Sequence, residues 1–227
     1  MLPEEDRTSL DKIANQYQLD KEKFKDFYFQ LSNDQLLSNV FRQHNVVMGI
    51  SPAFHVQEKL KPLKQRVRYT VEKIGSVNTS SYFYYPKSIH SLNILEQNAR
   101  GIGNLGYIPE KDGVVRKTPM MIKIGQTMWP SLELEMIRTA LNQKKYYLTE
   151  KYMQGHFVST GDYSIPTDQQ SQKWIYYKDP LPQQFISAAD VLDDSFNAQF
   201  IQNKIVYIGA TAVGLSDIVA TPRSPAI

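Results

Sequence analysis

The stretch Met128–Leu141, MWPSLELEMIRTAL, predicts a helix that starts immediately after Pro130. Ser131 is a residue type that caps helix N-termini, because its hydroxyl accepts a hydrogen bond from a free backbone N–H. Glu133 and Glu135 fall in the first turns, where the helix dipole favours negative charge. The side chains expected to face the core recur at helical spacing: Leu134, Ile137 and Leu141. Pro130 and Ser131 are therefore interpreted as structural helix-start residues.

The preceding segment, residues 103–120, reads GNLGYIPEKDGVVRKTPM and predicts two strands around a tight turn. Asp112 and Gly113 are residue types that accept the positive backbone dihedrals of such turns. Arg116 follows on the outgoing strand, where its guanidinium either pairs with Asp112 or binds an anionic ligand. Pairing is the favoured interpretation, and ligand contact remains the alternative.

Helices and strands alternate along the rest of the chain. Two helices are expected near the start of the chain: one is capped by Asp20, and one begins at Asn33 or Asp34. The side chains of the second that are expected to face inward are Leu36, Leu37, Val40 and Phe41. Two further helices are expected over residues 91–100, ending at Gly101, and over residues 186–192, capped by Ser187. The expected strands are residues 46–50, two within 66–85, 174–177, and a buried strand over 204–210. This alternation predicts an α/β fold, a single domain over residues 1–227 with a central mixed sheet flanked by helices.

The composition suits a globular domain without cysteine chemistry. The chain has 227 residues, 41% hydrophobic side chains, a formal net charge of +3 and no cysteine. The lack of cysteine excludes disulfides, thiolate metal ligands and cysteine nucleophiles, and it fits an oxidising compartment as well as many cytosolic proteins. The small net charge implies no nucleic-acid partner.

Two features bear on contact with membranes. No apolar stretch approaches the roughly 20 residues that a bilayer-spanning helix needs. The basic run at residues 59–68, KLKPLKQRVR, is interpreted as a solvated loop or edge strand. Contact with lipid head groups is the alternative interpretation of this run.

The sequence carries no motif for a metal, a cofactor or a catalytic nucleophile, and none of these is expected. A histidine-based metal site or triad would form only through the fold, because the histidines lie far apart: His44, His55, His90 and His156. Gly209 and Gly214 have the outer spacing of a phosphate loop, but the required lysine is missing. The glycines of residues 101–106 have dinucleotide-loop spacing but follow a helix and enter a strand, the reverse of the required context.

The exit of the strand expected over 204–210 is a second candidate ligand site beside Arg116. Gly209 and Gly214 are expected to let the backbone turn sharply there. Open α/β sheets bind ligands at the carboxyl ends of their strands. The candidate pocket residues at this exit are therefore Thr211, Ser216 and Asp217.

Four segments occur together in a specific order: residues 101–120, 129–138, 174–192 and 204–222. They contain an Asp-Gly-Val-Val-Arg turn, a Pro-Ser-Leu helix start, and an Ile-Gly-Ala-Thr strand exit followed by Asp217 and Thr221-Pro222. In this combination the chain resembles a CHASE domain of the second type, the sensing extracellular module associated with cyclases and histidine kinases. The resemblance covers roughly residues 86–222.

The resemblance implies a place and an architecture. Domains of this family sit outside the cytoplasmic membrane, between membrane helices, and regulate a cytoplasmic adenylate cyclase, a histidine kinase of a two-component system or a Ser/Thr kinase. The family's opening strand, its Asp-Asp-x-Ser-Leu motif and its segment after Thr221-Pro222 are not found here. We therefore expect a domain that is truncated at both ends and that is flanked by hydrophobic helices in the native protein. We expect this protein to be a homodimeric bacterial receptor that responds to an unidentified extracytoplasmic ligand.

Three classes of function are compared on this basis. Signal sensing through a two-state element is the leading hypothesis. The alternative is a structural dimerisation module without a small ligand, which a large exposed apolar face would favour. A hydrolase would need a nucleophile beside a base, and the sequence has no motif for one, so no catalytic residue is expected.

Overall fold

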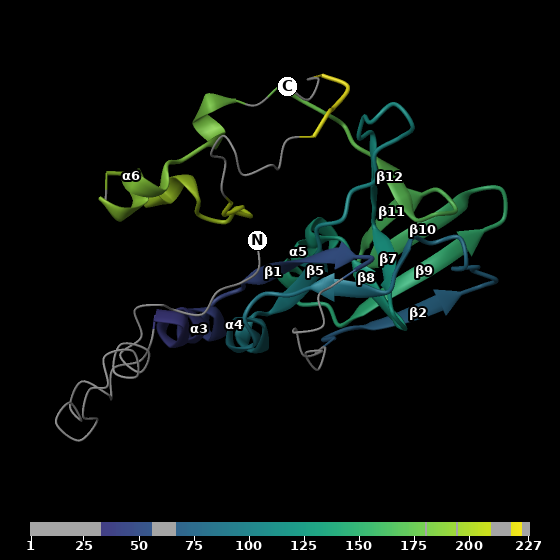
Figure 1. Ribbon diagram of the computed structural model, residues 1–227, viewed down its shortest axis with the longest axis horizontal. Coiled ribbons are helices and arrows are strands. Elements are labelled where there is room, and N and C mark those ends of the chain that lie inside the picture. The colour runs from purple at the N-terminus through teal and green to yellow at the C-terminus, as the bar shows by residue number, and fades with distance from the viewer. Residues whose placement is uncertain (1–32, 56–66, 180, 194, 210–218, 224–227) are drawn as a thin grey trace. The chain divides into compact units, whose positions relative to one another are not determined.

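The computed structural model describes residues 33–55, 67–179, 181–193, 195–209 and 219–223 (Figure 1). The chain divides into two compact units. Unit 1 comprises the chain up to Tyr107 together with Thr118–Lys173, and unit 2 comprises Ile108–Lys117 together with the chain from Trp174 onward. The helix expected after Asp20 and the basic run up to residue 66 lie outside the described residues.

Unit 1 contains most of the regular structure. Its elements are α3 (Asn33–Gln43), β1 (Val47–Ala53), β2 (Thr70–Ile74), β3 (Tyr84–Tyr85), β4 (Lys87–Ile89), α4 (Asn93–Asn98), β5 (Gly101–Asn104), β7 (Met121–Ile124), β8 (Thr127–Pro130), α5 (Leu132–Ala140), β9 (Lys145–Lys151), β10 (Gly155–Thr160) and β11 (Tyr163–Thr167). The short strands β6 (Lys117–Pro119) and β12 (Gln172–Trp174) form a two-stranded sheet.

The strands of unit 1 form mixed sheets, which confirms the α/β class. One sheet has the order β4-β1-β5, with β4 antiparallel and β5 parallel to β1. Another has the order β11-β10-β9-β2, an antiparallel meander to which β2 adds in parallel. A third has the order β3-β7-β8. The expected central sheet is thus divided among several small sheets, and α5 lies against β5 and β1 (Figure 1).

The core of unit 1 consists of two apolar clusters. The first joins the meander to α5 and β7: Tyr69, Val77, Tyr82, Met120, Met121, Leu134, Tyr146, Leu148 and Val158. The second lies around the β7-β8 hairpin: Ile50, Ile102, Ile122, Ile124 and Trp129. Burial of side chains of this size stabilises a fold by roughly 1.5–3 kcal/mol each. These clusters hold the strand ends and helices from which the candidate sites project.

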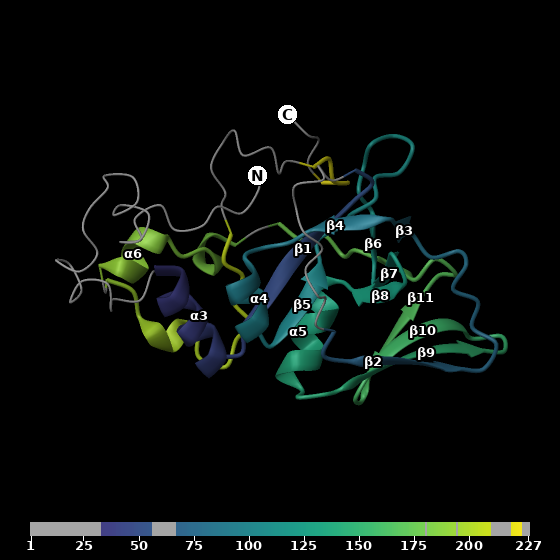
Figure 2. The same ribbon diagram turned by 60° about the horizontal axis from the view of Figure 1, so that its bottom comes forward.

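Helix α3 packs against α4 through polar contacts (Figure 2). The Ser38 hydroxyl donates to the Ile94 carbonyl at 2.8 Å, and the Asn98 amide donates to Ser38 Oγ at 2.7 Å. Arg42 Nε donates to Asn98 Oδ1 at 3.2 Å. The helix expected from Asn33 is confirmed, but its expected inward face is wrong: Ser38 is buried, while the side chains that remain exposed are Leu36, Leu37 and Val40.

Helix α4 ends differently from the prediction. Ala99 has an extended backbone (φ −64°, ψ 145°) and terminates the helix. Gly101 does not cap α4 with a positive φ. It is the first residue of β5, where it pairs with Val47 of β1.

Unit 2 has short helical turns in its described part. These are η1 (Pro182–Gln184), α6 (Ala188–Leu192) and η2 (Ala198–Phe200). Helix α6 is capped by Ser187 as expected, since the Ser187 hydroxyl accepts from the Ala189 N–H at 3.2 Å. Val114 forms a parallel bridge with Ala220, and Val115 is buried.

Two strands expected in this part of the chain are not formed. In the expected strand 174–177, Trp174 ends β12 and residues 175–177 have no regular structure. In the expected buried strand 204–210, the described residues 204–209 form no strand, and Ile208 is 99% exposed. Apolar β-branched runs have strand propensity, but a strand also needs a partner that sequence alone does not identify.

Candidate functional site

Three polar side chains meet where β4 leads into α4, and we call them the His90 cluster: Ser88, His90 and Glu96. Ser88 and His90 are two residues apart, so in an extended segment they share a face. The Ser88 hydroxyl lies 2.8 Å from His90 Nε2. On the other side of the ring, His90 Nδ1 lies 3.0 Å from Glu96 Oε2 and 3.1 Å from Oε1.

The His90 cluster is largely shielded from water. The side chains of His90 and Glu96 are 12% and 8% exposed. The Trp129 ring stands edge-on to the imidazole, with 6.3 Å between the ring centroids. The backbone N–H of Ser91 donates to Glu96 Oε1 at 2.9 Å, which fixes the carboxylate.

The partners of the imidazole determine which nitrogen carries its proton. An ionised carboxylate only accepts hydrogen bonds, so His90 Nδ1 donates to Glu96. In the neutral ring, Nε2 is then the acceptor for the Ser88 hydroxyl. In this tautomer the lone pair of Nε2 accepts the hydrogen bond from Ser88, while the Nδ1 proton is held by Glu96.

A hydroxyl, an imidazole and a carboxylate in this order also occur in acyl-transfer enzymes. Those enzymes additionally require hydrogen-bond donors aimed at the developing oxyanion. The contacts of the described residues establish the chain from Ser88 to Glu96 and no oxyanion donors. Sequence analysis missed this cluster; the available signal was a Ser-x-His pair at the end of a strand, followed closely by a helical glutamate.

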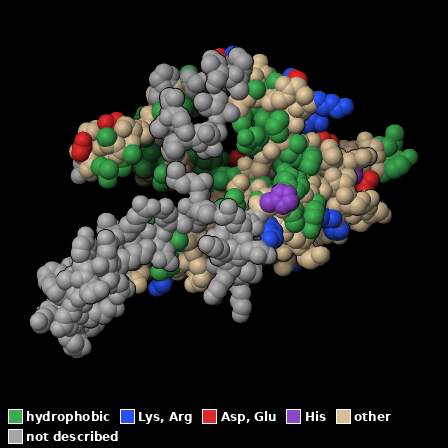
Figure 3. Space-filling model, in the orientation of Figure 1, with side chains coloured by type: hydrophobic (Ala, Val, Ile, Leu, Met, Phe, Trp, Pro, Cys, Tyr) green, Lys and Arg blue, Asp and Glu red, His purple; other side chains and the backbone are tan. Residues whose placement is uncertain are grey.

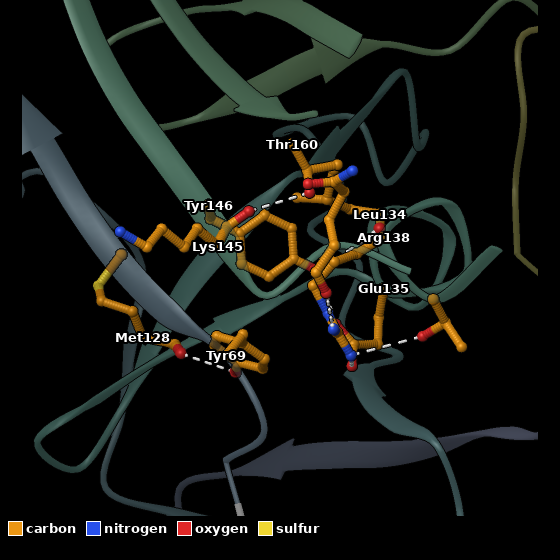
Figure 4. Close-up of polar contacts among 10 residues, drawn as sticks. Tyr69, Met128, Leu134, Glu135, Arg138, Lys145, Tyr146 and Thr160 are labelled. Carbon is orange, nitrogen blue, oxygen red and sulfur yellow. Dashed lines mark hydrogen bonds and ion pairs between the residues drawn. The ribbon is translucent and has the colours of Figure 1, made fainter. Parts of the chain in front are cut away.

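A second polar group lies inside unit 1, and Figure 4 shows Glu135 and Arg138 of α5 directed toward Tyr146 of β9. The Glu135 side chain is fully buried, and its two oxygens accept from Arg138 Nη2 at 2.6 Å and Nε at 2.8 Å. The Tyr146 hydroxyl donates to Glu135 Oε2 at 2.5 Å. Nearby, the Tyr69 hydroxyl donates to the Met128 carbonyl at 2.9 Å. We call Glu135, Arg138 and Tyr146 the buried triad.

Burial and charge together determine the ionisation of these groups. Burial, with the charge of Glu135 and the hydrogen bond to it, raises the pKa of Tyr146. Burial and the Glu135 charge also raise the pKa of Tyr69. Burial alone would lower the pKa of Arg138, but its hydrogen bonds to Glu135 and the carboxylate charge raise it. Tyr146 is thus a neutral donor and Arg138 a cation, so the triad is a structural tie between α5 and β9.

Strand β5 approaches α5 so closely that it is built on glycine. A Cβ on Gly101 would come within 2.8 Å of Glu135 Cγ and overlap the carboxylate. A Cβ on Gly103 would come within 2.5 Å of Leu132 Cα. The glycine spacing that resembles a dinucleotide loop is therefore a packing requirement, because it lets β5 contact the start of α5.

The helix start predicted at Pro130 and Ser131 is confirmed. Pro130 ends β8, and the Ser131 hydroxyl accepts from the Leu134 N–H at 3.2 Å. Leu134 is buried as expected, but Leu141 is 38% exposed. The other buried residues of α5 are polar, namely Glu135 and Arg138. Glu135 was expected to interact with the helix dipole, and its contact with Arg138 was not anticipated.

In unit 2, Arg116 pairs with two carboxylates. Its Nη1 and Nη2 donate to the two oxygens of Asp112 at 3.0 and 2.7 Å, and Nη1 also donates to Glu110 at 2.8 Å. The hydrogen bond from Arg116, aided by the Val114 N–H, lowers the pKa of Asp112 to about 2. This geometry is the structural pairing favoured from the sequence, and the guanidinium is engaged by this chain's own carboxylates.

The turn itself is only partly as predicted. Gly113 has a φ of 81°, as expected, while Asp112 is not among the residues with positive φ. Gly113 N–H donates to the Glu110 carbonyl at 2.8 Å, so the turn is formed locally. The strands expected on both sides of the turn are shorter than predicted: they are β5 and β6, and residues 105–110 have no regular structure.

The other predicted ligand residues are not brought to a described site. Gly209 is the last described residue before the turn expected from the sequence, and it has no positive φ. Gly214 and the three candidate pocket residues lie outside the described residues: Thr211, Ser216 and Asp217.

The described surface carries no concentrated charge on the face shown in Figure 3, where Lys and Arg side chains form small separate groups. Within the described ranges, no three His, Asp or Glu side chains are grouped as metal ligands. No helix among these residues has the length and apolar character to cross a bilayer.

Comparison with known proteins gives one match. A family model described as "CHASE2 domain" matches residues 3–227. No curated protein and no solved structure matches the chain. CHASE2 domains are typically extracellular sensing domains of signalling receptors and are not themselves catalytic. The match extends over almost the entire sequence and includes parts of both compact units. The chain therefore belongs to the CHASE2 domain family.

Proposed function

We propose that this chain is the extracytoplasmic sensing domain of a bacterial transmembrane receptor that regulates a cytoplasmic output module. The observation that carries the proposal is the family match over residues 3–227. The output module would be an adenylate cyclase, a histidine kinase or a Ser/Thr kinase. Hydrophobic helices on both sides of the domain would anchor it, and the receptor would act as a homodimer.

Signal input requires an element with two arrangements of similar free energy. The contact between α3 and α4 supports such a role, because it includes hydrogen bonds around Ser38 and Asn98. Polar contacts of this kind exchange partners at a lower cost in free energy than a close-packed apolar core. In this proposal, α3 changes its position on α4 when the signal arrives.

The test uses the full-length receptor in membranes. A reporter fused after this domain should locate it outside the cytoplasm, and the output activity should change when the Ser38-centred contact is altered by Ser38→Ala. Asn39→Ala, on the same helix, is the control. A full-length reading frame without membrane segments, or output that is unchanged by Ser38→Ala in a folded receptor, would contradict the proposal.

Arg116, Thr211, Ser216 and Asp217 remain the proposed ligand residues of this sensor. If Arg116 and Asp217 contact a ligand, Arg116→Ala and Asp217→Ala should leave the melting temperature within a few degrees and change receptor output. If they form a structural pair, each change should lower stability, and the double variant should cost less than the sum of the singles. The bonds from Arg116 to Asp112 and Glu110 favour a structural role for the guanidinium.

A dimerisation module without a small ligand is the second candidate function. The observation that favours it is a run of exposed apolar residues in unit 2: Phe200, Ile201, Ile205, Val206, Tyr207 and Ile208. Exposed apolar groups in such a run are typical of protein interfaces. In this alternative, the run contacts a second copy of the chain. Ile208→Asp should then lower the mass measured by light scattering from dimer to monomer, whereas Tyr152→Asp on unit 1 should not.

A further inference from the structure

We propose that the His90 cluster is a proton-binding site, and that proton uptake at His90 Nε2 alters the packing of α4 against α3. The proposal rests on the sensing function proposed above and names its input as a proton. An imidazole is the side chain whose charge changes between about pH 5 and 8. His90 is placed for this role by the geometry of its two ring nitrogens, each of which has a different partner.

Protonation reverses one of the two hydrogen bonds. In the neutral ring, the Ser88 hydroxyl donates to Nε2 across 2.8 Å. A proton taken from solvent converts Nε2 into a donor, so the Ser88 hydroxyl must turn its own proton away and accept. At the same time, the bond from Nδ1 to Glu96 becomes an ion pair.

The ion pair matters because Glu96 is nearly buried. A buried carboxylate without a countercharge is costly, and the cost falls when a cation lies within hydrogen-bond distance. With a neutral ring, Glu96 is held by hydrogen bonds from His90 and from the Ser91 N–H. With a charged ring, the attraction between β4 and α4 is stronger, so α4 is held more firmly at low pH than at high pH.

Other ionisable groups lie on or beside the elements around the cluster: Arg68 donates to the Gln97 carbonyl of α4, and His44 directly follows the end of α3. The sequences of β1 and β8, which pack next to β4 and His90, contain no ionisable side chain. Lys87 lies at the exposed start of β4. Helix α3 contributes Asp34 and Arg42, and Arg42 is hydrogen-bonded to Asn98. Thus Glu96 is the charged group that directly contacts His90.

The position of α4 is transmitted to α3 by direct contacts. Glu96 lies between Ile94 and Asn98 on α4, and these two residues hold Ser38 of α3. Arg42, one turn further along α3, also contacts Asn98. Figure 2 shows α4 beside α3, so a change in the position of α4 at Glu96 reaches α3 through these contacts.

The test is a pH titration of the 227-residue chain followed by NMR. The His90 ring resonances should shift as the ring takes up its proton, and the amide signals of Ser38 and Asn98 should follow with the same midpoint. His90→Gln should abolish the shifts on α3, whereas the control His156→Gln, on β10, should leave them unchanged. Amide signals of α3 that do not follow His90 in the wild-type chain would overturn the proposal.

A second variant separates charge from hydrogen bonding. Glu96→Gln retains an oxygen that accepts from Nδ1 but removes the countercharge, so the midpoint of the α3 transition should move to lower pH. An unchanged midpoint would overturn the role of the ion pair. Labelling of Ser88 by a fluorophosphonate, lost in His90→Gln, would overturn the proposal in favour of acyl transfer. These measurements use the chain alone, so they are independent of whether the full-length receptor signals.

Discussion

At the scale of single residues, Glu135 has the most demanding environment in unit 1. Its carboxylate is fully buried and is balanced by the Arg138 guanidinium, which is 6% exposed, and by the Tyr146 hydroxyl. Such a pair is not a strong source of net stability, because desolvation offsets most of the attraction. Removing only one member of the pair is nevertheless costly, because the charge of the other member stays in the core without a countercharge.

We therefore expect Glu135→Gln to lower the free energy of unfolding by about 3–5 kcal/mol, since Arg138 is left buried without a countercharge. Glu133→Gln is the control, because Glu133 lies on the same helix in an exposed position. Urea unfolding followed by circular dichroism measures both variants. Equal stabilities of the two would show that water reaches Arg138 and that the triad is not closed.

The pairing of Asp112 with Arg116 predicts a dependence of stability on acid. The folded-state pKa of Asp112 is about 2, below the ordinary value of 3.8. Its pairing therefore stabilises the folded state above about pH 4, and this contribution is lost as the pH falls toward 2.

Asp112→Asn should remove that contribution. The difference in unfolding free energy between the wild-type chain and Asp112→Asn should be small, should persist above pH 4, and should shrink as the pH falls to 2. Denaturant unfolding at several pH values measures it, with the exposed Asp162→Asn as the control. A difference that grows on acidification would mean that Asp112 is not stabilised as an anion.

At the scale of elements, α5 was predictable because its determinants are local. The Ser131 cap, the acidic first turn and the buried Leu134 all lie within one helical segment, and the structure confirms each of them. The burial of Glu135 and Arg138 was not predictable, because it depends on Tyr146 from a strand that follows the helix.

The failed predictions concern contacts between distant segments. The sequence pattern correctly predicted helix α3, but it also predicted that the apolar residues of the helix are buried. In the structure, the buried residue of α3 is Ser38, which hydrogen-bonds to α4. The meander β9-β10-β11 received no prediction, although its alternating residues and turns were visible. The His90 cluster joins Ser88 to Glu96 across the start of α4, and no short motif marks it.

Gly101 and Gly113 are both sensitive to substitution, but for different physical reasons. Gly101 has an ordinary φ but no space for a side chain, because a Cβ would overlap Glu135. Gly113 has open space but a φ of 81°. Gly101→Ala should destabilise by about 1–3 kcal/mol through overpacking. Gly113→Val should cost about 1–3 kcal/mol through backbone strain.

Replacement by asparagine separates the two causes, since asparagine tolerates a positive φ. Gly113→Asn should thus be close to the wild-type chain, while Gly101→Asn should be at least as destabilised as Gly101→Ala. Thermal melts compare the four variants. If Gly113→Asn is as unstable as Gly113→Val, the turn is held by contacts beyond its own backbone.

At the scale of the whole molecule, the two units differ in how much core their described residues contain. Unit 1 contains both apolar clusters. Among the described residues of unit 2, Val115 is the buried hydrophobic side chain, while Ile208 and Leu192 are 99% and 83% exposed. Because apolar burial is the main favourable term in folding, the two units should differ in local stability.

Hydrogen exchange should resolve that difference. The amides of β9 and β10 lie in a ladder above Tyr146, Leu148 and Val158, all fully buried, and residues 198–209 contain the exposed apolar run. We expect exchange in β9 and β10 to be at least about a thousandfold slower, since roughly 4 kcal/mol of opening free energy corresponds to three factors of ten. Glu135→Gln should reduce protection in β9 without affecting residues 198–209. Equal protection of both segments at every protein concentration would contradict the prediction. Equal protection found only at high protein concentration would mean that a second copy of the chain covers the exposed run, as the dimerisation alternative requires.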